Sequence, residues 1–288
     1  MTVISAERVK ELREKTGVGM MECKKALTEA GGDFENAVDI LRQRGLAAAA
    51  KKSGRTAAEG VIGLYTTEEA GVLVEINSET DFVAKNEEFQ KFAKSVAEVV
   101  LTKNPADVDA LSTLPLGGAT IETRRQELVQ KIGENLSVRR FVRFETAGRV
   151  AAYLHGTRIG VLVDFEGGDD QTGKDIAMQI AAANPMYLSR DTVPADALER
   201  EKAIFEAQAK ESGKPANVIG KMVEGKLEKF YSEVCLLDQV FIKDPDGKQK
   251  IKDILKGGMV RRFARFQVGE GIEKRKDNFC EEVASQLK

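Results

Sequence analysis

The sequence predicts an α+β fold built around a duplicated core. Segments with helical periodicity alternate with short apolar runs typical of strands, which is the pattern of helices packed on sheets. The seven-residue segment Val138–Phe144 (VRRFVRF) returns as Val260–Phe266 (VRRFARF). A matching run, GVLV, precedes each copy at Gly71–Val74 and Gly160–Val163. We therefore expect two related α+β subdomains with antiparallel sheets.

Residues 1–55 are expected to form a small three-helix domain followed by a basic linker. Ser5 can cap the first helix, which should stop at Thr16, just before a glycine turn. Asp33 is a good N-cap for the third helix. The stretch 46–60, rich in Ala, Lys and Gly, is interpreted as a basic connector.

The first core subdomain is assigned to residues 56–145. Its expected order is strand, strand, helix, a variable-looking stretch, helix and strand. The predicted ranges are 60–66 and 71–77 for the first two strands, 80–100 for one continuous helix, 121–136 for the next helix and 138–145 for the last strand.

The second core subdomain is assigned to residues 146–192 and 234–268, and it carries an insertion. Val72 and Val138 in the first copy are 66 positions apart, whereas Val161 and Val260 in the second are 99 apart. About 33 extra residues therefore lie in the second copy.

The extra residues are expected to form an antiparallel helical hairpin, a short coiled coil, over residues 193–233. A hairpin with little core beneath it usually packs against something else, such as a second copy of itself. Residues 269–288 then close the chain as a C-terminal helical module, in which a glycine-rich turn leads to a short helix.

Composition narrows the function. The 44 basic and 46 acidic residues give a net charge of −2, which argues against a protein that coats nucleic acid. No apolar run approaches the ~18 residues of a membrane span, and the first residues lack the apolar core of a signal peptide. Cys23, Cys235 and Cys280 show no metal-ligand spacing, and Cys23 falls on an apolar helical stripe. We expect a reduced, cytoplasmic protein without a cofactor.

Three features of the sequence suggest a nucleotide-binding loop, an RNA-binding sheet or a catalytic histidine, but the residues themselves support these assignments poorly. Gly168–Lys174 has the spacing of a phosphate-binding loop, but Asp175 follows where Ser or Thr is needed, so an acidic turn capping a helix is favoured. The strands that interleave arginine with aromatic residues resemble some RNA-binding sheets, but a strand with one apolar and one mixed face is favoured. His155 is the single histidine, which argues against an enzyme.

Four motifs, in order along the whole chain, resemble the elongation factor Ts family. They are the amino-terminal TGVGMMECKKAL of Thr16–Leu27, the ETDFVAKN of Glu79–Asn86, the HGTRIGVLV of His155–Val163 and the VGEGIEK of Val268–Lys274. The likeness implies an exchange factor that binds elongation factor Tu in its GDP-bound and nucleotide-free forms and promotes GDP release, so that GTP can bind. The alternative is an RNA-binding or ribosome-associated factor that uses the Arg/Phe strands.

The resemblance also implies roles for individual residues. The amino-terminal domain would be ubiquitin-associated-like and would dock on the GTPase domain. Asp81 and Phe82, preceded by Thr80, would form a wedge beside the Mg²⁺ and phosphate site of the partner. Further contacts would come from Arg13, Met20, Met21, Lys24, His155 and Ile242.

Two points stay open at the level of sequence. Without the resemblance, the residues favour Thr80–Asp81 as a helix cap, with Phe82 as the hydrophobic residue that staples the first turn. The working species can be one factor per GTPase, a homodimer, or a two-plus-two complex joined through the hairpin. No direct contact with nucleic acid or membrane is expected.

Overall fold

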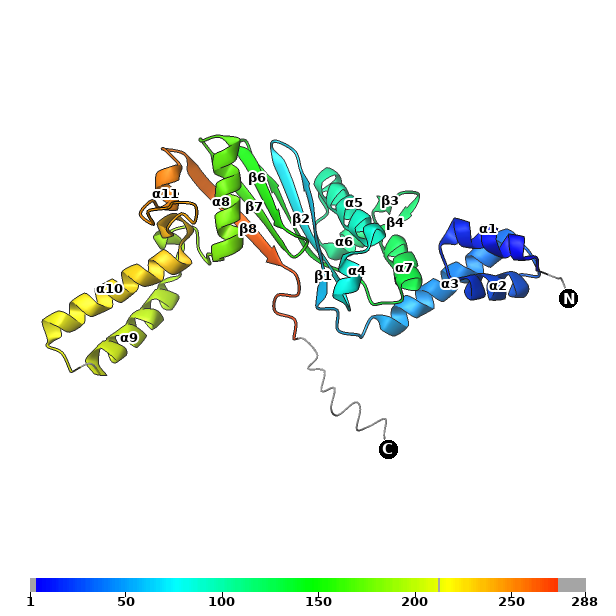
Figure 1. Cartoon of the computed structure of the whole chain (residues 1–288), viewed down its shortest axis with the longest axis horizontal. Coiled ribbons are helices and arrows are strands. Elements are labelled where there is room, and N and C mark those ends of the chain that lie inside the picture. Colours follow the sequence, from blue (N-terminus) through cyan, green and yellow to red (C-terminus); the bar gives the residue numbers. More distant parts are fainter. Residues whose placement is uncertain (1–3, 212, 274–288) are drawn as a thin grey trace, which may run out of the picture. The chain divides into compact units, whose positions relative to one another are not determined.

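The computed structural model describes residues 4–211 and 213–273, and it confirms the α+β class, with helices and antiparallel sheets (Figure 1). The chain divides into two compact units. Unit 1 comprises Met1–Gly63, Val74–Phe141 and Gln267–Lys288, and unit 2 comprises Leu64–Leu73 and Val142–Phe266. The predicted C-terminal helix over 269–288 lies largely outside the described residues.

The amino-terminal part of unit 1 is a bundle of α1 (Ala6–Thr16), α2 (Met20–Glu29) and α3 (Phe34–Lys52). Its start and stop signals act as expected. The Ser5 side chain accepts a hydrogen bond from the Arg8 N–H, Asp33 accepts one from the Asn36 N–H, and α1 ends at Gly17 with a left-handed backbone. The bundle has its own core, made of Val9, Leu12, Val18, Cys23, Ala26, Leu27, Ala37 and Leu41.

The predicted connector over 46–60 is wrong in its first half, because α3 continues through it to Lys52. Four consecutive alanines and two lysines follow Leu46, and these residues have high helix propensities. The helix therefore has no reason to stop at Gly45. Only residues 53–58 link it to the first strand.

The first sheet contains β1 (Glu59–Thr66), β2 (Ala70–Ser78) and β5 (Ser137–Glu145), in that order. Every residue of β2 is buried, as expected for a central strand. Between β2 and β5 come four helices and a small hairpin, namely α4 (Asp81–Ala84), α5 (Glu87–Lys103), α6 (Val108–Thr113), β3 (Pro115–Leu116), β4 (Ala119–Thr120) and α7 (Ile121–Ile132).

The single helix predicted over 80–100 is in fact two, α4 and α5. The Asn86 side chain caps α5 by accepting hydrogen bonds from the N–H groups of Glu88 and Phe89, at 3.0 and 3.1 Å. Residues 85 and 86 therefore break the helix, and α4 is left as one turn that precedes the break. The next predicted helix ends at Ile132, earlier than expected, because Gly133 forms its left-handed C-cap.

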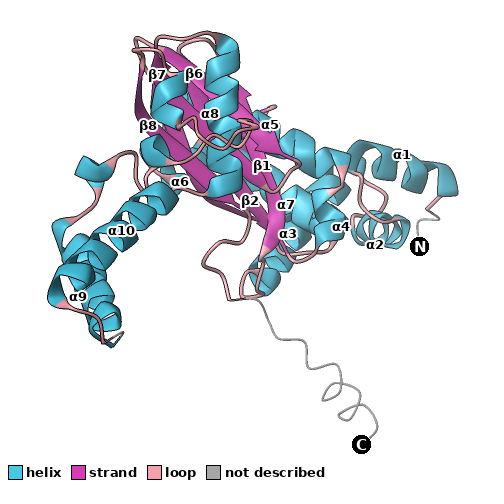
Figure 2. Cartoon of the chain, turned by 60° about the vertical axis from the view of Figure 1, so that its left-hand side comes forward, coloured by secondary structure: helices cyan, strands magenta, loops and turns pink. Residues whose placement is uncertain are grey.

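The second sheet repeats the first in outline. It contains β6 (Arg149–His155), β7 (Ile159–Glu166) and β8 (Met259–Gln267), in that order. Strands β6 and β7 are antiparallel, with Arg149 opposite Phe165 and His155 opposite Ile159. Helix α8 (Asp170–Ala183) packs on β6 and β7, as Figure 2 shows.

The insertion is helical, as predicted. Helices α9 (Ala195–Glu211) and α10 (Ala216–Val234) pack against each other, with Ala209 and Val223 buried (Figure 1). Short elements follow, namely η2 (Leu236–Asp238) and α11 (Ile251–Ile254), and η1 (Arg190–Thr192) precedes the hairpin. None of the described helices is long and apolar enough to cross a membrane.

Candidate partner-binding site

Phe82 is the most exposed large apolar side chain among the described residues, with 77 % of its surface accessible. It lies on α4, whose other side is buried through Val83 and Ala84. Asp81, the first residue of the helix, is also exposed. One turn of helix therefore sits on the core by one side and presents a carboxylate and an aromatic ring to solvent by the other.

The cap-and-staple interpretation of this segment is wrong. Thr80 occupies the N-cap position, but its side chain accepts no capping hydrogen bond. Instead the Thr80 hydroxyl donates to Glu134 Oε1 at 2.6 Å, and the Thr80 N–H donates to Glu134 Oε2 at 3.0 Å. A stapling phenylalanine would be packed against the turn, whereas Phe82 faces water.

The residue after α4 adds a positive charge to the exposed tip. Lys85 Nζ lies 3.7 Å from an oxygen of Asp81 and 5.7 Å from the centroid of the Phe82 ring. Both side chains of the ion pair are exposed, so the pair contributes little to stability. The tip therefore offers a partner three kinds of contact within one turn: an anion, a cation and an apolar ring.

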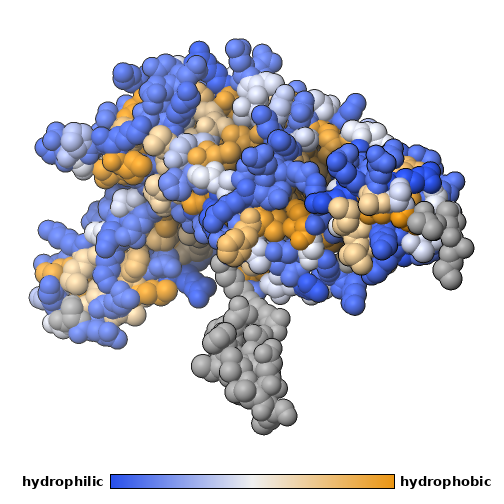
Figure 3. Space-filling model, turned by 45° about the vertical axis from the view of Figure 1, so that its right-hand side comes forward, coloured by the Kyte–Doolittle hydropathy of each residue, from blue (hydrophilic) through white to orange (hydrophobic). Residues whose placement is uncertain are grey.

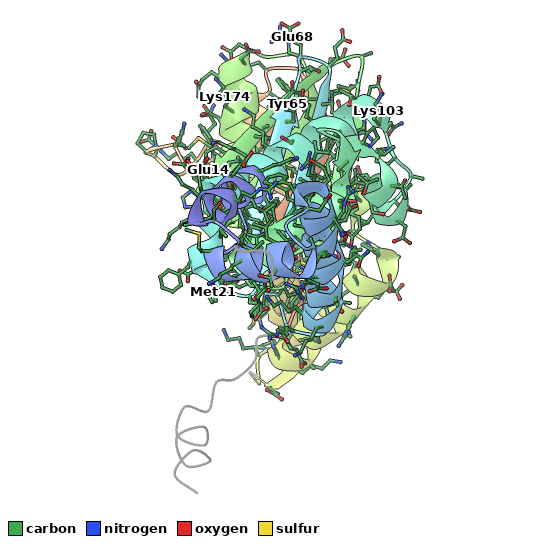
Figure 4. The ribbon with its side chains drawn as sticks, turned by 90° about the vertical axis from the view of Figure 1, so that its right-hand side faces the viewer. Glu14, Met21, Tyr65, Glu68, Lys103 and Lys174 are labelled. Carbon is green, nitrogen blue, oxygen red and sulfur yellow. The ribbon has the colours of Figure 1, made fainter. Side chains whose placement is uncertain are left out.

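In the bundle, Met20 and Met21 begin α2 directly after Gly19 and are 43 % and 65 % exposed. Cys23, which follows Met21 by two positions, belongs to the buried core of the bundle. Figure 4 shows Met21 on the outer side of the amino-terminal helices, and Figure 3 shows apolar residues scattered over a largely hydrophilic surface. Both methionines are thus available for contact rather than packing.

The predicted basic contacts of the bundle are also exposed. Arg13 lies on the outer side of α1, and Lys24 lies one turn after the methionines on α2. Met21 and Lys24 line a shallow groove together with Lys25, Thr28, Glu29 and Arg44. The groove combines apolar and charged lining, which suits a protein surface better than a small apolar ligand.

The two remaining predicted residues belong to unit 2. His155 ends β6 and is exposed, with Nδ1 3.2 Å from the Tyr153 hydroxyl. Ile242 is 50 % exposed, and its N–H donates to Oε1 of the buried Gln179 at 2.9 Å. Gln179 also donates from Nε2 to the Val240 carbonyl, at 3.2 Å. One buried amide thus holds the segment that presents Ile242.

Three of the strand arginines that suggested RNA binding pair with buried acids. Arg139 and Arg140 both bind the carboxylate of Glu75, at 3.0 and 2.6 Å, and Glu75 is fully buried in β2. The second copy repeats the arrangement, with Arg262 3.0 Å from the buried Asp164 of β7. These guanidinium groups neutralise buried acids, which gives three of the arginines a structural role without a nucleic-acid partner.

The segment with phosphate-loop spacing is a helix cap, as favoured from the sequence. Asp169 Oδ1 accepts hydrogen bonds from the N–H and the hydroxyl of Thr172, at 2.8 and 2.7 Å. The Thr172 N–H holds the pKa of the Asp169 carboxyl below its usual range. A carboxylate therefore occupies the helix amino terminus that a phosphate would need.

Two residues of the site carry no signal in the sequence. Glu134 and Gln179 touch the candidate contact segments from positions far away in the chain, 54 residues from Thr80 in the case of Glu134. Glu75, in contrast, could have been found, because one acid inside the apolar run VLVEI demands a buried cation, and the VRR segment offers it.

Comparisons with known proteins find relatives of the chain. The sequence profile of the family described as Elongation factor TS matches residues 79–270. Proteins named Elongation factor Ts are similar over the whole chain. The one from Burkholderia multivorans (strain ATCC 17616 / 249) is 55 % identical over 289 aligned positions, and that from Paraburkholderia phytofirmans (strain DSM 17436 / LMG 22146 / PsJN) is 56 % identical. Each alignment covers 100 % of this chain and 98 % of the relative.

Proposed function

The chain belongs to the elongation factor Ts family, whose members serve translation elongation, and from this premise we propose that it is the guanine nucleotide exchange factor of elongation factor Tu. It binds the GDP-bound GTPase, opens the Mg²⁺ and phosphate site and promotes GDP release. The observation that carries the proposal is the exposed Asp81–Phe82 tip, an aromatic ring in water on a helical turn whose other side is buried.

Exchange of this kind follows from linked binding. A factor that binds the open, nucleotide-free GTPase better than the GDP form weakens GDP binding by the same coupling free energy. GDP is held by a phosphate loop and by Mg²⁺, so separating the elements around the metal releases the nucleotide. No covalent bond forms or breaks, and the mechanism therefore requires neither a catalytic residue nor a cofactor.

Phe82 supplies the preference for the open form. Its ring can be buried only where two partner elements separate, and burial of a phenylalanine contributes roughly 1.5–3 kcal/mol. A tenfold change in GDP affinity corresponds to about 1.4 kcal/mol. The ring alone therefore accounts for one to two factors of ten, and the Asp81 carboxylate can accept hydrogen bonds from groups that the shift releases.

The remaining contacts supply binding free energy away from the nucleotide. Arg13, Met20, Met21 and Lys24 would dock the bundle on the GTPase domain. His155 and Ile242 would contact a different domain of the partner. Contacts made equally in both states hold the factor in place, and those that are stronger in the open state offset the cost of distorting the nucleotide site.

The assembly and its location complete the proposal. We expect the factor to act in the cytoplasm, where its partner works, with a ubiquitin-associated-like bundle over residues 1–55. The α9–α10 hairpin would join two copies into a homodimer or a two-plus-two complex with the GTPase. Sedimentation equilibrium of the factor alone and with elongation factor Tu measures this stoichiometry.

The test is the release of a fluorescent GDP analogue from elongation factor Tu. Wild-type factor should accelerate release strongly, and Phe82→Ala should lower the acceleration by about tenfold to a hundredfold, as the burial free energy implies. Met259→Ala is the matched control, because Met259 is an exposed apolar residue at the start of β8, 53 % accessible, with no proposed contact. An inactive wild-type factor, or a Phe82→Ala variant as active as the control, would contradict the proposal.

A further inference from the structure

The tip that carries Phe82 cannot hold its own shape. Helix α4 has four residues, Asp81–Ala84, and a single helical turn is unstable by itself in water. Its N-cap residue makes no capping hydrogen bond with its side chain. The direction in which the ring points must therefore be fixed by contacts with the rest of unit 1.

At the carboxyl end of α4 the contact comes from the neighbouring helix. Gln90 Nε2 donates to the Ala84 carbonyl at 2.8 Å. At the amino end the principal contact is Glu134, whose two carboxylate oxygens accept one hydrogen bond each from Thr80, from its N–H at 3.0 Å and its hydroxyl at 2.6 Å. Hydrogen bonds to an ionised acceptor are about twice as strong as those between neutral groups.

The segment around Glu134 also donates a hydrogen bond back to the segment around Thr80. The Asn135 N–H donates to Glu79 Oε1 at 2.6 Å. Residues 134–135, between α7 and β5, and residues 79–80, between β2 and α4, thus exchange hydrogen bonds through one carboxylate on each side. The Asn135 side chain donates a hydrogen bond from Nδ2 to the carbonyl oxygen of Arg55, at 2.8 Å, just after the three-helix bundle. The base of the tip is consequently fixed by charge-assisted hydrogen bonds.

We propose that Glu134 is a positioning residue for exchange, which sets the orientation of Asp81 and Phe82 through Thr80 without touching the partner itself. The inference rests on the proposed function. A ring that is already oriented loses less conformational entropy when it inserts between partner elements, so fixing Thr80 favours the state in which GDP leaves. Both carboxylate oxygens serve as acceptors in this contact, and hydrogen bonds to a charged acceptor are the stronger kind.

The proposal is tested by measuring GDP release from elongation factor Tu as a function of factor concentration. Glu134→Ala should lower the maximal release rate about tenfold, equivalent to roughly 1.4 kcal/mol, with little change in the half-saturating concentration, and Glu134→Gln should lower it less. Glutamine keeps the size of the side chain and can accept from the Thr80 N–H while donating to the Thr80 hydroxyl, but it lacks the negative charge. Glu127→Gln is the control, since Glu127 lies on the same helix α7 and pairs with Arg124 at 2.8 Å.

A double-mutant cycle with Phe82→Ala separates positioning from general stability. If Glu134 acts through the ring, Glu134→Ala should have almost no further effect in the Phe82→Ala background. Full additivity, or an unchanged maximal rate in both Glu134 variants, would overturn the inference. If Phe82→Ala itself leaves exchange intact, the proposed function fails instead.

A second readout does not depend on the partner. Amide hydrogen exchange of a peptide covering residues 79–86 should become about tenfold faster in Glu134→Ala than in wild type or Glu127→Gln. Unchanged protection of that peptide would contradict the claim that Glu134 fixes the tip.

Discussion

Glu75 shows what a buried charge requires of its neighbours. Burial alone would raise the pKa of its carboxyl, but the N–H of Gly269 and the guanidinium groups of Arg140 and Arg139 reverse the effect and hold the pKa below its usual range. The Gly269 N–H lies 2.8 Å from the carboxylate. The Glu75 carboxylate thus binds both strand β5 and the segment that directly follows β8.

Replacing Glu75 by glutamine should lower the free energy of unfolding at pH 7 by about 1–3 kcal/mol, because two partly exposed arginines lose a buried partner but keep Glu270. The folded pKa is depressed, so this stabilisation is present above the unfolded pKa of roughly 4.3 and is lost as pH falls through the lower folded value. Urea titrations of both proteins between pH 7 and pH 3 check this. A stability difference that does not shrink at acid pH would contradict it.

At the scale of elements, close contact between helix and sheet is achieved with glycine. Gly173 lies in α8, where a Cβ atom would come within 2.6 Å of the Phe165 ring and 2.8 Å of the Ala151 Cβ. Gly220 lies in α10, where a Cβ atom would meet nothing within 4 Å. The glycine at position 173 therefore allows the helix to pack closely on the sheet, whereas no neighbouring group requires a glycine at position 220.

The two glycines should respond to alanine with opposite signs. Alanine gains up to about 1 kcal/mol over glycine in a helix interior, and overpacking a core costs roughly 1–3 kcal/mol. We expect Gly173→Ala to destabilise the protein by about 1–2 kcal/mol and Gly220→Ala to stabilise it slightly. Thermal unfolding followed by circular dichroism measures both, and a stabilised Gly173→Ala would show that the ring can move aside.

Element boundaries also show where prediction from sequence succeeds and fails. Ser5, Asp33 and Gly17 mark their helix ends correctly, because caps act within three or four residues. Asn86 carries the same kind of signal, yet it is hidden inside an apolar periodicity that continues across the break. The Asp81–Phe82 tip is identifiable through its resemblance to a family motif. Its exposure is not predictable, since the Glu134 contact that replaces the cap joins residues 54 positions apart.

At the scale of the whole molecule, each compact unit contains one described cysteine. Cys23 lies in the bundle core of unit 1 and Cys235 in unit 2, and both are buried free thiols. Burial raises the pKa of Cys23, and burial together with the nearby Asp238 raises the pKa of Cys235 to about 11. Neither thiol reacts readily until its surroundings open, because the thiolate is the nucleophile.

We expect the amino-terminal bundle to unfold at a lower urea concentration than unit 2. Its core has eight buried residues, and small domains bury too little surface to be very stable. In a Cys280→Ser background, thiol labelling at increasing urea should modify Cys23 at a lower concentration than Cys235, which mass spectrometry of the digested protein resolves. Coincident labelling midpoints would instead indicate that the chain unfolds as one cooperative unit.

Because Phe82 is exposed, a fluorescent residue at its position would report on binding of the partner. The chain contains no tryptophan, so Phe82→Trp would introduce its single indole at the end of the tip. In the free protein that indole would emit as in water, and it would shift to the blue when a partner buries it. One substitution would thus turn the insertion step into an optical signal, with no dye attached to either protein.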